Sequence, residues 1–107
     1  MDSHLAQSIR IPVIQTSEYR VLLQSLRIND AQYTFVHCDV LKLTASSLRD
    51  LRMDWNTFVD LHNAPLLALS ELGDEKHQHF LELFDFKYLQ DLTGEDGTTR
   101  KLYIHTK

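Results

Sequence analysis

The sequence predicts an α+β fold, a helix-dominated single domain with about four helices and a small two- to three-stranded sheet. The chain has 107 residues, which is close to the commonest size of one domain. It is 43% hydrophobic with only 3 Gly and 2 Pro, a composition typical of folded chains and not of disordered ones. Apolar residues recur mostly at helical spacing, with short alternating segments between them.

The N-terminal residues predict a tail and then an edge strand. Residues 1–8 mix small and polar side chains without periodicity, so we expect a flexible tail before one domain over 9–107. Isoleucine and valine then alternate with other residues over 9–14, which is a strand pattern. Because Pro12 has no N–H to donate, this strand is expected at a sheet edge or as extended coil.

The next segment predicts a first helix over 17–28. Thr16 and Ser17 are good N-cap residues. Apolar residues follow at i, i+3, i+4 and i+7, namely Tyr19, Leu22, Leu23 and Leu26. Asn29 and Asp30 have the chemistry of a turn and are expected to end the helix.

A strand and a long helix are predicted in the middle of the chain. The segment 33–41 is rich in aromatic and β-branched residues, which favours a strand, although a helical face also fits its spacing. The clearest helical periodicity begins after candidate caps near Thr44 and runs to His62 on one apolar stripe, Leu48, Leu51, Trp55, Phe58 and Val59. Pro65 follows, and it suits the first turn of a short third helix through Leu72.

The C-terminal third permits two interpretations. Asp74 can cap a fourth helix that presents apolar residues at helical spacing as far as Leu92. Alternatively, the aromatic residues over 84–88 alternate as in a strand. Residues 93–97 are then a helix exit or a hairpin turn, and both interpretations end in a strand over 99–105.

Charge and cysteine content exclude several classes of protein. The net charge is -4, with 11 basic and 15 acidic residues, which disfavours nucleic acid and anionic membranes as partners. The single Cys38 excludes intramolecular disulfides. No leader-like segment and no apolar run of about 20 residues is present, so we expect a cytoplasmic chain that does not enter a membrane.

No motif predicts catalysis, a metal or a cofactor. The His37–Cys38 pair suggests a thiolate nucleophile, but neighbours in a strand project to opposite faces. His77 and His79 point apart on a helix and lack the spacing of zinc ligands. Three glycines in total cannot supply most phosphate-binding loops. We therefore expect no enzyme, no metal and no cofactor, and the ordinary role of an isolated thiol is that of a small buried hydrophobe.

A helix-turn-helix is one alternative function for the segment 44–61. Arg49 and Arg52 would lie on its first helix, and Asp54 would cap the second. That second helix offers only Asn56 and Thr57 to reach bases, which disfavours specific DNA binding.

Apolar residues in the second half of the chain exceed what one small core needs, which predicts a surface for a partner. The predicted partner-binding residues are Leu66, Leu67, Leu69, Phe80, Leu83, Phe84, Phe86 and Tyr88.

Our leading hypothesis is a regulatory or inhibitory protein, expected as a homodimer. It would bind another protein through an apolar helical surface, for example as an anti-activator that sequesters a bacterial transcription regulator of the quorum-sensing type by blocking its dimerisation. An immunity or anti-defence protein that neutralises a toxin or enzyme is the other alternative.

Overall fold

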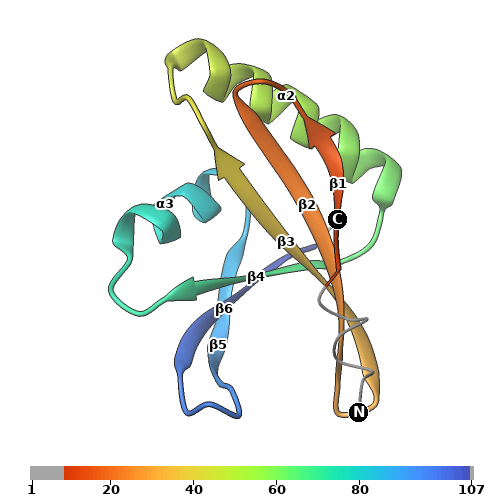
Figure 1. The fold of residues 1–107 in the computed structure, drawn as a ribbon, viewed down its shortest axis with the longest axis vertical. Coiled ribbons are helices and arrows are strands. Elements are labelled where there is room, and N and C mark those ends of the chain that lie inside the picture. Colours follow the sequence, from red (N-terminus) through yellow and green to blue (C-terminus); the bar gives the residue numbers. More distant parts are fainter. Residues whose placement is uncertain (1–8, 107) are drawn as a thin grey trace.

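The chain forms six strands and two helices over residues 9–106, which are the residues described by the computed structural model (Figure 1). The elements in chain order are β1 (Arg10–Gln15), β2 (Tyr19–Ile28), β3 (Ala31–Val40), α2 (Ala45–His62), β4 (Leu66–Glu71), α3 (Glu75–Leu83), β5 (Lys87–Thr93) and β6 (Thr99–His105). The predicted tail over residues 1–8 lies outside the described residues.

All six strands belong to one mixed sheet with the order β1-β2-β3-β4-β6-β5. Strands β1, β2 and β3 form an antiparallel meander, and β4, β6 and β5 form a second antiparallel group. The two groups meet where β3 and β4 pair in parallel, with Phe35 opposite Leu67. Figure 1 shows that β4 crosses the β2–β3 hairpin steeply, so the hairpins β2–β3 and β5–β6 diverge as two arms toward the bottom of the view.

The predicted helix-dominated architecture is wrong, because strands hold 47% of the described residues and helices hold 28%. The predicted first helix over 17–28 is strand β2. Its Asn29 and Asp30 do form a turn, but both have positive φ (51° and 67°) and connect β2 directly to β3, as in a two-residue hairpin turn of type I′.

Strand β2 resembles a helix in sequence because it is apolar on both faces. Tyr19, Val21 and Leu23 pack with the core cluster under the helices, whereas Leu26 and Ile28 pack with a second cluster on the other face. The predicted helical pattern combined residues from the two faces of the strand, with Tyr19 and Leu23 on one face and Leu22 and Leu26 on the other. A strand covered on one side would have shown a clear alternation instead.

The predicted third and fourth helices also differ from the structure. The predicted third helix from Pro65 to Leu72 is strand β4, whose first three residues are all buried. Gly73 does have the left-handed conformation expected after a helix (φ 85°), but it lies in the turn between β4 and α3. The predicted fourth helix is confirmed from its cap Asp74 but ends at Leu83, because the chain turns through Asp85 (φ 69°) into β5.

The predicted strands over 9–14, 33–41 and 99–105 are confirmed as β1, β3 and β6. The long helix is confirmed as α2, with Thr44 as N-cap and Asn63 as left-handed C-cap. Residues 93–97 form a hairpin turn between β5 and β6 and not a helix exit. No helix in the described part of the chain is long and apolar enough to cross a membrane.

Both helices pack on the same face of the sheet. The buried stripe of α2 is Ser47, Leu51, Trp55 and Val59. Leu81 of α3 joins this stripe in one cluster with residues of β2, β4 and β6. The Tyr19 hydroxyl donates a hydrogen bond of 2.7 Å to the Asp54 carboxylate and so ties β2 to α2. Burial and this carboxylate raise the pKa of Tyr19 to about 12.

Removing the N-cap of α2 should destabilise the protein. The Thr44 hydroxyl accepts a hydrogen bond from the Ser47 backbone N–H (3.0 Å), and the Ser47 side chain accepts one from the Thr44 N–H (2.7 Å). We expect Thr44→Ala to lower the free energy of unfolding by about 1 kcal/mol, measured by urea denaturation. The matched control is Thr57→Ala on the same helix, since Thr57 is exposed and only bonds back to Met53. An equal loss in both variants would contradict the capping role.

Candidate functional site

The helix-free face of the sheet carries its own apolar cluster. The buried members of this cluster are Phe35, Leu67 and Leu102, which come from three adjacent strands. Partly buried residues pack around them, namely Leu26, Ile28, Leu69, Leu92 and Ile104. Neither of the two described helices contributes a residue to this cluster.

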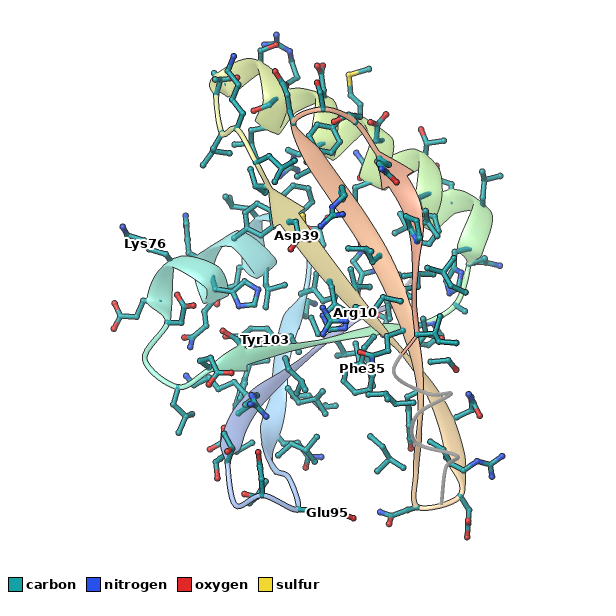
Figure 2. All side chains as sticks on the ribbon, viewed as in Figure 1. Arg10, Phe35, Asp39, Lys76, Glu95 and Tyr103 are labelled. Carbon is teal, nitrogen blue, oxygen red and sulfur yellow. The ribbon has the colours of Figure 1, made fainter. Side chains whose placement is uncertain are left out.

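A cleft of about 710 Å³ opens over this cluster, between the β2–β3 hairpin and the β5–β6 hairpin. Its floor includes Phe35, Leu67 and Ile104, and Figure 2 shows Phe35 close to the crossing of β3 and β4. Tyr33 and Leu89, which are 40% and 51% exposed, stand at its two sides. Among residues 9–106, no Asp, Glu, Lys or Arg lines the cleft.

The upper part of the same face is polar, in contrast to the cleft. Arg20 and Asp39 form a half-exposed ion pair of 2.7 Å between β2 and β3. His37 lies beside them and makes a 2.7 Å hydrogen bond to Gln24. Burial and the nearby Arg10 lower the pKa of His37, so its imidazole is neutral at pH 7. The apolar cleft therefore has a distinct boundary on the sheet.

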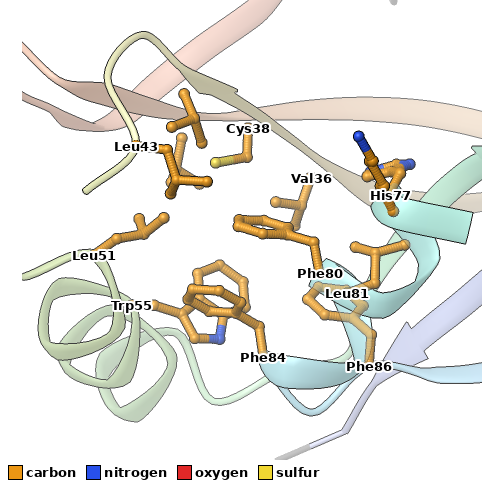
Figure 3. A pocket seen from close by; sticks show the side chains of 13 residues that line it. Val36, Cys38, Leu43, Leu51, Trp55, His77, Phe80, Leu81, Phe84 and Phe86 are labelled. Carbon is orange, nitrogen blue, oxygen red and sulfur yellow. The ribbon is translucent and has the colours of Figure 1, made fainter. Parts of the chain in front are cut away.

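A second concave site lies on the opposite face, between the sheet and the two helices. This cavity of about 310 Å³ is walled by aromatic and aliphatic side chains from β2, β3, α2 and α3. Figure 3 shows Cys38, Leu51, Trp55 and Phe80 arranged around it, with the Cys38 sulfur directed inward and His77 at one side. The stacked rings of Trp55 and Phe86, with centroids 5.7 Å apart, form part of its wall.

The eight predicted partner-binding residues do not form one surface. Leu66, Phe84 and Phe86 are buried under the helices. Phe80 lines the cavity together with Phe84 and Phe86. Leu67 and Leu69 lie on the helix-free face. Leu83, at the end of α3, and Tyr88, on β5, are exposed.

The cleft residues that were not predicted had a signal in the sequence. Leu102 and Ile104 are two apart in a predicted strand, as are Tyr33 and Phe35, and residues two apart share one face of a strand. Four of the cleft residues could therefore have been assigned to sheet faces. Their convergence could not, because it depends on the parallel pairing of β3 with β4.

Cys38 lacks the environment of a catalytic thiol. Burial and the neighbouring Asp39 raise the pKa of the thiol from 9.0 to about 11, so it is protonated at neutral pH. His37 projects to the opposite face of the sheet, as the sequence predicts for adjacent strand residues. His105 packs edge-on against Trp55, with ring centroids 5.5 Å apart.

The structure does not place the predicted helix-turn-helix or the His77 and His79 pair in the geometry that DNA binding or metal binding requires. The segment considered as a helix-turn-helix is one uninterrupted helix, α2. His77 bonds to Ser70 (3.0 Å) while His79 is exposed on α3. Within residues 9–106, no group of three or more His, Cys, Asp or Glu side chains is placed to hold a metal ion.

The chain was compared with models of protein families, with curated proteins and with solved structures, and none of the three comparisons gives a match.

Cys38 should react slowly with thiol reagents while the protein is folded. Its pKa of about 11 lies about two units above that of a free thiol, so its thiolate fraction at pH 8 is about a hundredfold lower. We expect the rate of alkylation to rise steadily from pH 7 to 10 in the native protein. The control is the urea-unfolded chain, which should react about a hundredfold faster at pH 8. Equal rates in the two states would contradict this assignment.

Proposed function

We propose that this protein is a non-enzymatic binding protein and that its cleft takes up an amphipathic helix of another protein. The single observation that carries the proposal is the apolar cluster on the helix-free face, with the cleft that opens over it. The sequence-based hypothesis placed the binding surface on a helix of this chain. In the present proposal this chain supplies the groove, and the partner supplies the helix.

The layering of the fold supports a helix as the occupant. Strand β4 is apolar on both faces, since Leu66 and Ala68 face the helices and Leu67 and Leu69 face away. Strands in parallel pairing are ordinarily covered on both faces, most often by helices. One face is already covered by α2 and α3. A helix bound in the cleft would complete the second outer layer.

The composition of the cleft supports a protein partner. Interface centres are depleted in charged residues and enriched in aromatic ones, with polar groups at the rim. The cleft fits this description, because its apolar floor includes Phe35 and its edges carry Asn29, Gln32 and Gln90. Among the described residues the lining holds one histidine, His62, and no Asp, Glu, Lys or Arg, which also favours the apolar stripe of an amphipathic helix over a charged segment.

The proposed biological role follows from what such a groove can do. A transcription regulator that dimerises through an apolar helix would lose that helix to the cleft, which is the action of an anti-activator. The role needs no catalytic residue or cofactor and places the chain in the cytoplasm. The uninterrupted α2 and the net charge of -4 give no support to DNA as the ligand.

Site-specific photo-crosslinking tests this proposal. We would replace Leu89 at the edge of the cleft with benzoylphenylalanine and irradiate the protein in a lysate of its native host. The matched control is the same replacement at Leu72, which is similarly exposed (54% against 51%) but lies outside the cleft. We expect an adduct specific to position 89, whose crosslinked peptide belongs to an amphipathic helix of another protein.

The purified partner then gives a quantitative test. Leu89→Glu should weaken its binding at least about tenfold, because it buries a charge in an apolar interface. Leu72→Glu should leave the affinity within about twofold. The proposal is overturned if no adduct is specific to position 89, if the adduct joins two copies of this chain, or if both substitutions act equally.

A further inference from the structure

The cavity between the helices and the sheet offers a second site, separate from the cleft. It lies on the opposite face of the sheet, bounded by β2, β3, α2 and α3 (Figure 3). Its volume of about 310 Å³ is at the lower end of the range for small-molecule sites, which is about 300–1,000 Å³. Protein interiors otherwise pack as densely as organic crystals. A concavity of this size is therefore a candidate ligand site.

The size and wall of the cavity define the body of the ligand. A water-sized group takes about 30 Å³, so the cavity accommodates about ten non-hydrogen atoms. The wall carries the aromatic rings of Trp55, Phe80, Phe84 and Phe86 together with aliphatic side chains. The aromatic rings pack on one another, with Phe80 and Phe84 at 4.8 Å between centroids. The surroundings favour an apolar chain or ring.

The exposed part of the lining, at Val40, Leu43 and Lys76, is the mouth of the cavity, and it defines the head group. Lys76 is the one formally charged side chain among the described residues that line the cavity, and Figure 2 shows it directed outward from α3. Beside it, His77 is held by its 3.0 Å hydrogen bond to Ser70. Asp74, the N-cap of α3, and Glu75 directly precede these residues, but neither lines the cavity. Asp74 accepts a hydrogen bond from the His77 backbone N–H (3.2 Å). The Lys76 ammonium is the charge in the described lining that attracts an anion.

We propose that this cavity binds a small monocarboxylate with an apolar tail, such as a medium-chain fatty acid. The tail lies against the rings of Trp55, Phe80 and Phe84, and the carboxylate pairs with Lys76 at the mouth. A single negative charge suits the site, because Lys76 is the one Lys or Arg among the described lining residues and two carboxylates, Asp74 and Glu75, directly precede it in the chain. This ligand site is independent of the partner cleft, from which the sheet separates it.

Octanoate, with ten non-hydrogen atoms, is the probe for this site. Trp55 is the sole tryptophan of the chain, so its fluorescence reports directly on the cavity. We expect a saturable change on titration of the full-length protein with octanoate. Octanoate should also slow the alkylation of Cys38, the sole cysteine, whose sulfur faces the same space.

Substitution of Lys76 tests the head group. An ion pair at an exposed mouth contributes about 0.2–1 kcal/mol, so Lys76→Gln should weaken octanoate binding by up to about fivefold and leave octanol binding unchanged. The matched control is Lys87→Gln, which removes the same charge from an exposed position outside the cavity. Equal effects of Lys76→Gln on octanoate and octanol, or no effect on either, would refute the role of Lys76.

Substitution of Val40 tests the position of the tail. Val40 lines the cavity and is 37% exposed, so Val40→Phe should obstruct the cavity without disturbing the buried core. Val13 is also 37% exposed but lies on β1 away from the cavity, which makes Val13→Phe the matched control. We expect octanoate binding to fall at least tenfold in Val40→Phe only. Equal binding by both variants, or no saturable binding by the unmodified protein, overturns the proposal.

Discussion

The parallel pairing of β3 with β4, where Phe35 stands opposite Leu67, is the constraint on which the rest of the structure depends. It joins two antiparallel groups of strands that would otherwise be separate small sheets. Parallel neighbours require a crossover connection, and α2 is that connection. Because side chains alternate along a strand, a slip of one residue at this pairing would turn the apolar faces of the two groups to opposite sides.

This register produces two different faces. On one face, Trp55 of α2 contacts Phe84, Phe86 and His105, with ring centroids 5.5 to 6.5 Å apart, which joins α2 to the segment after α3 and to β6. Arg52 strengthens the same connection, since its guanidinium donates to the Leu83 carbonyl and lies over the Phe84 ring. On the other face neither described helix contributes to the apolar cluster, and the apolar residues of the two groups of strands converge in the cleft, which His62 at the end of α2 also lines. The cavity under the helices and the cleft are thus separated by the sheet itself.

Local signals in the sequence sufficed for part of this fold. The stripe of α2 from Leu51 to Val59, its cap Thr44 and the cap Asp74 of α3 were all readable, because each depends on neighbours within a few residues. Strands β2 and β4 were misread because they are apolar on both faces, so that Leu22 and Leu26 complete a false helical pattern with Tyr19 and Leu23. The same apolar character of both faces gives the sheet one cluster under the helices and a second cluster on the opposite face.

The candidate sites were less predictable than the elements. The excess of apolar residues in the second half of the chain predicted a partner surface, but those residues divide between two clusters that also include residues of the first half. The aromatic residues Phe84 and Phe86 were assigned to a partner surface, whereas they pack under the helices against Trp55. Phe35 and Leu102 were not assigned, although they form the floor of the cleft. Both errors arise because pairing between distant strands decides which face a residue occupies.

Methyl NMR with a soluble paramagnetic gadolinium chelate tests most directly whether one face of the sheet is free of helices. Leu92 and Ile104 on the helix-free face should show strong relaxation enhancement. Leu51 and Leu66 under the helices should show little, and the pattern should persist in dilute, monomeric protein. Equal relaxation enhancement of the methyl groups on both faces would contradict this register and the open cleft.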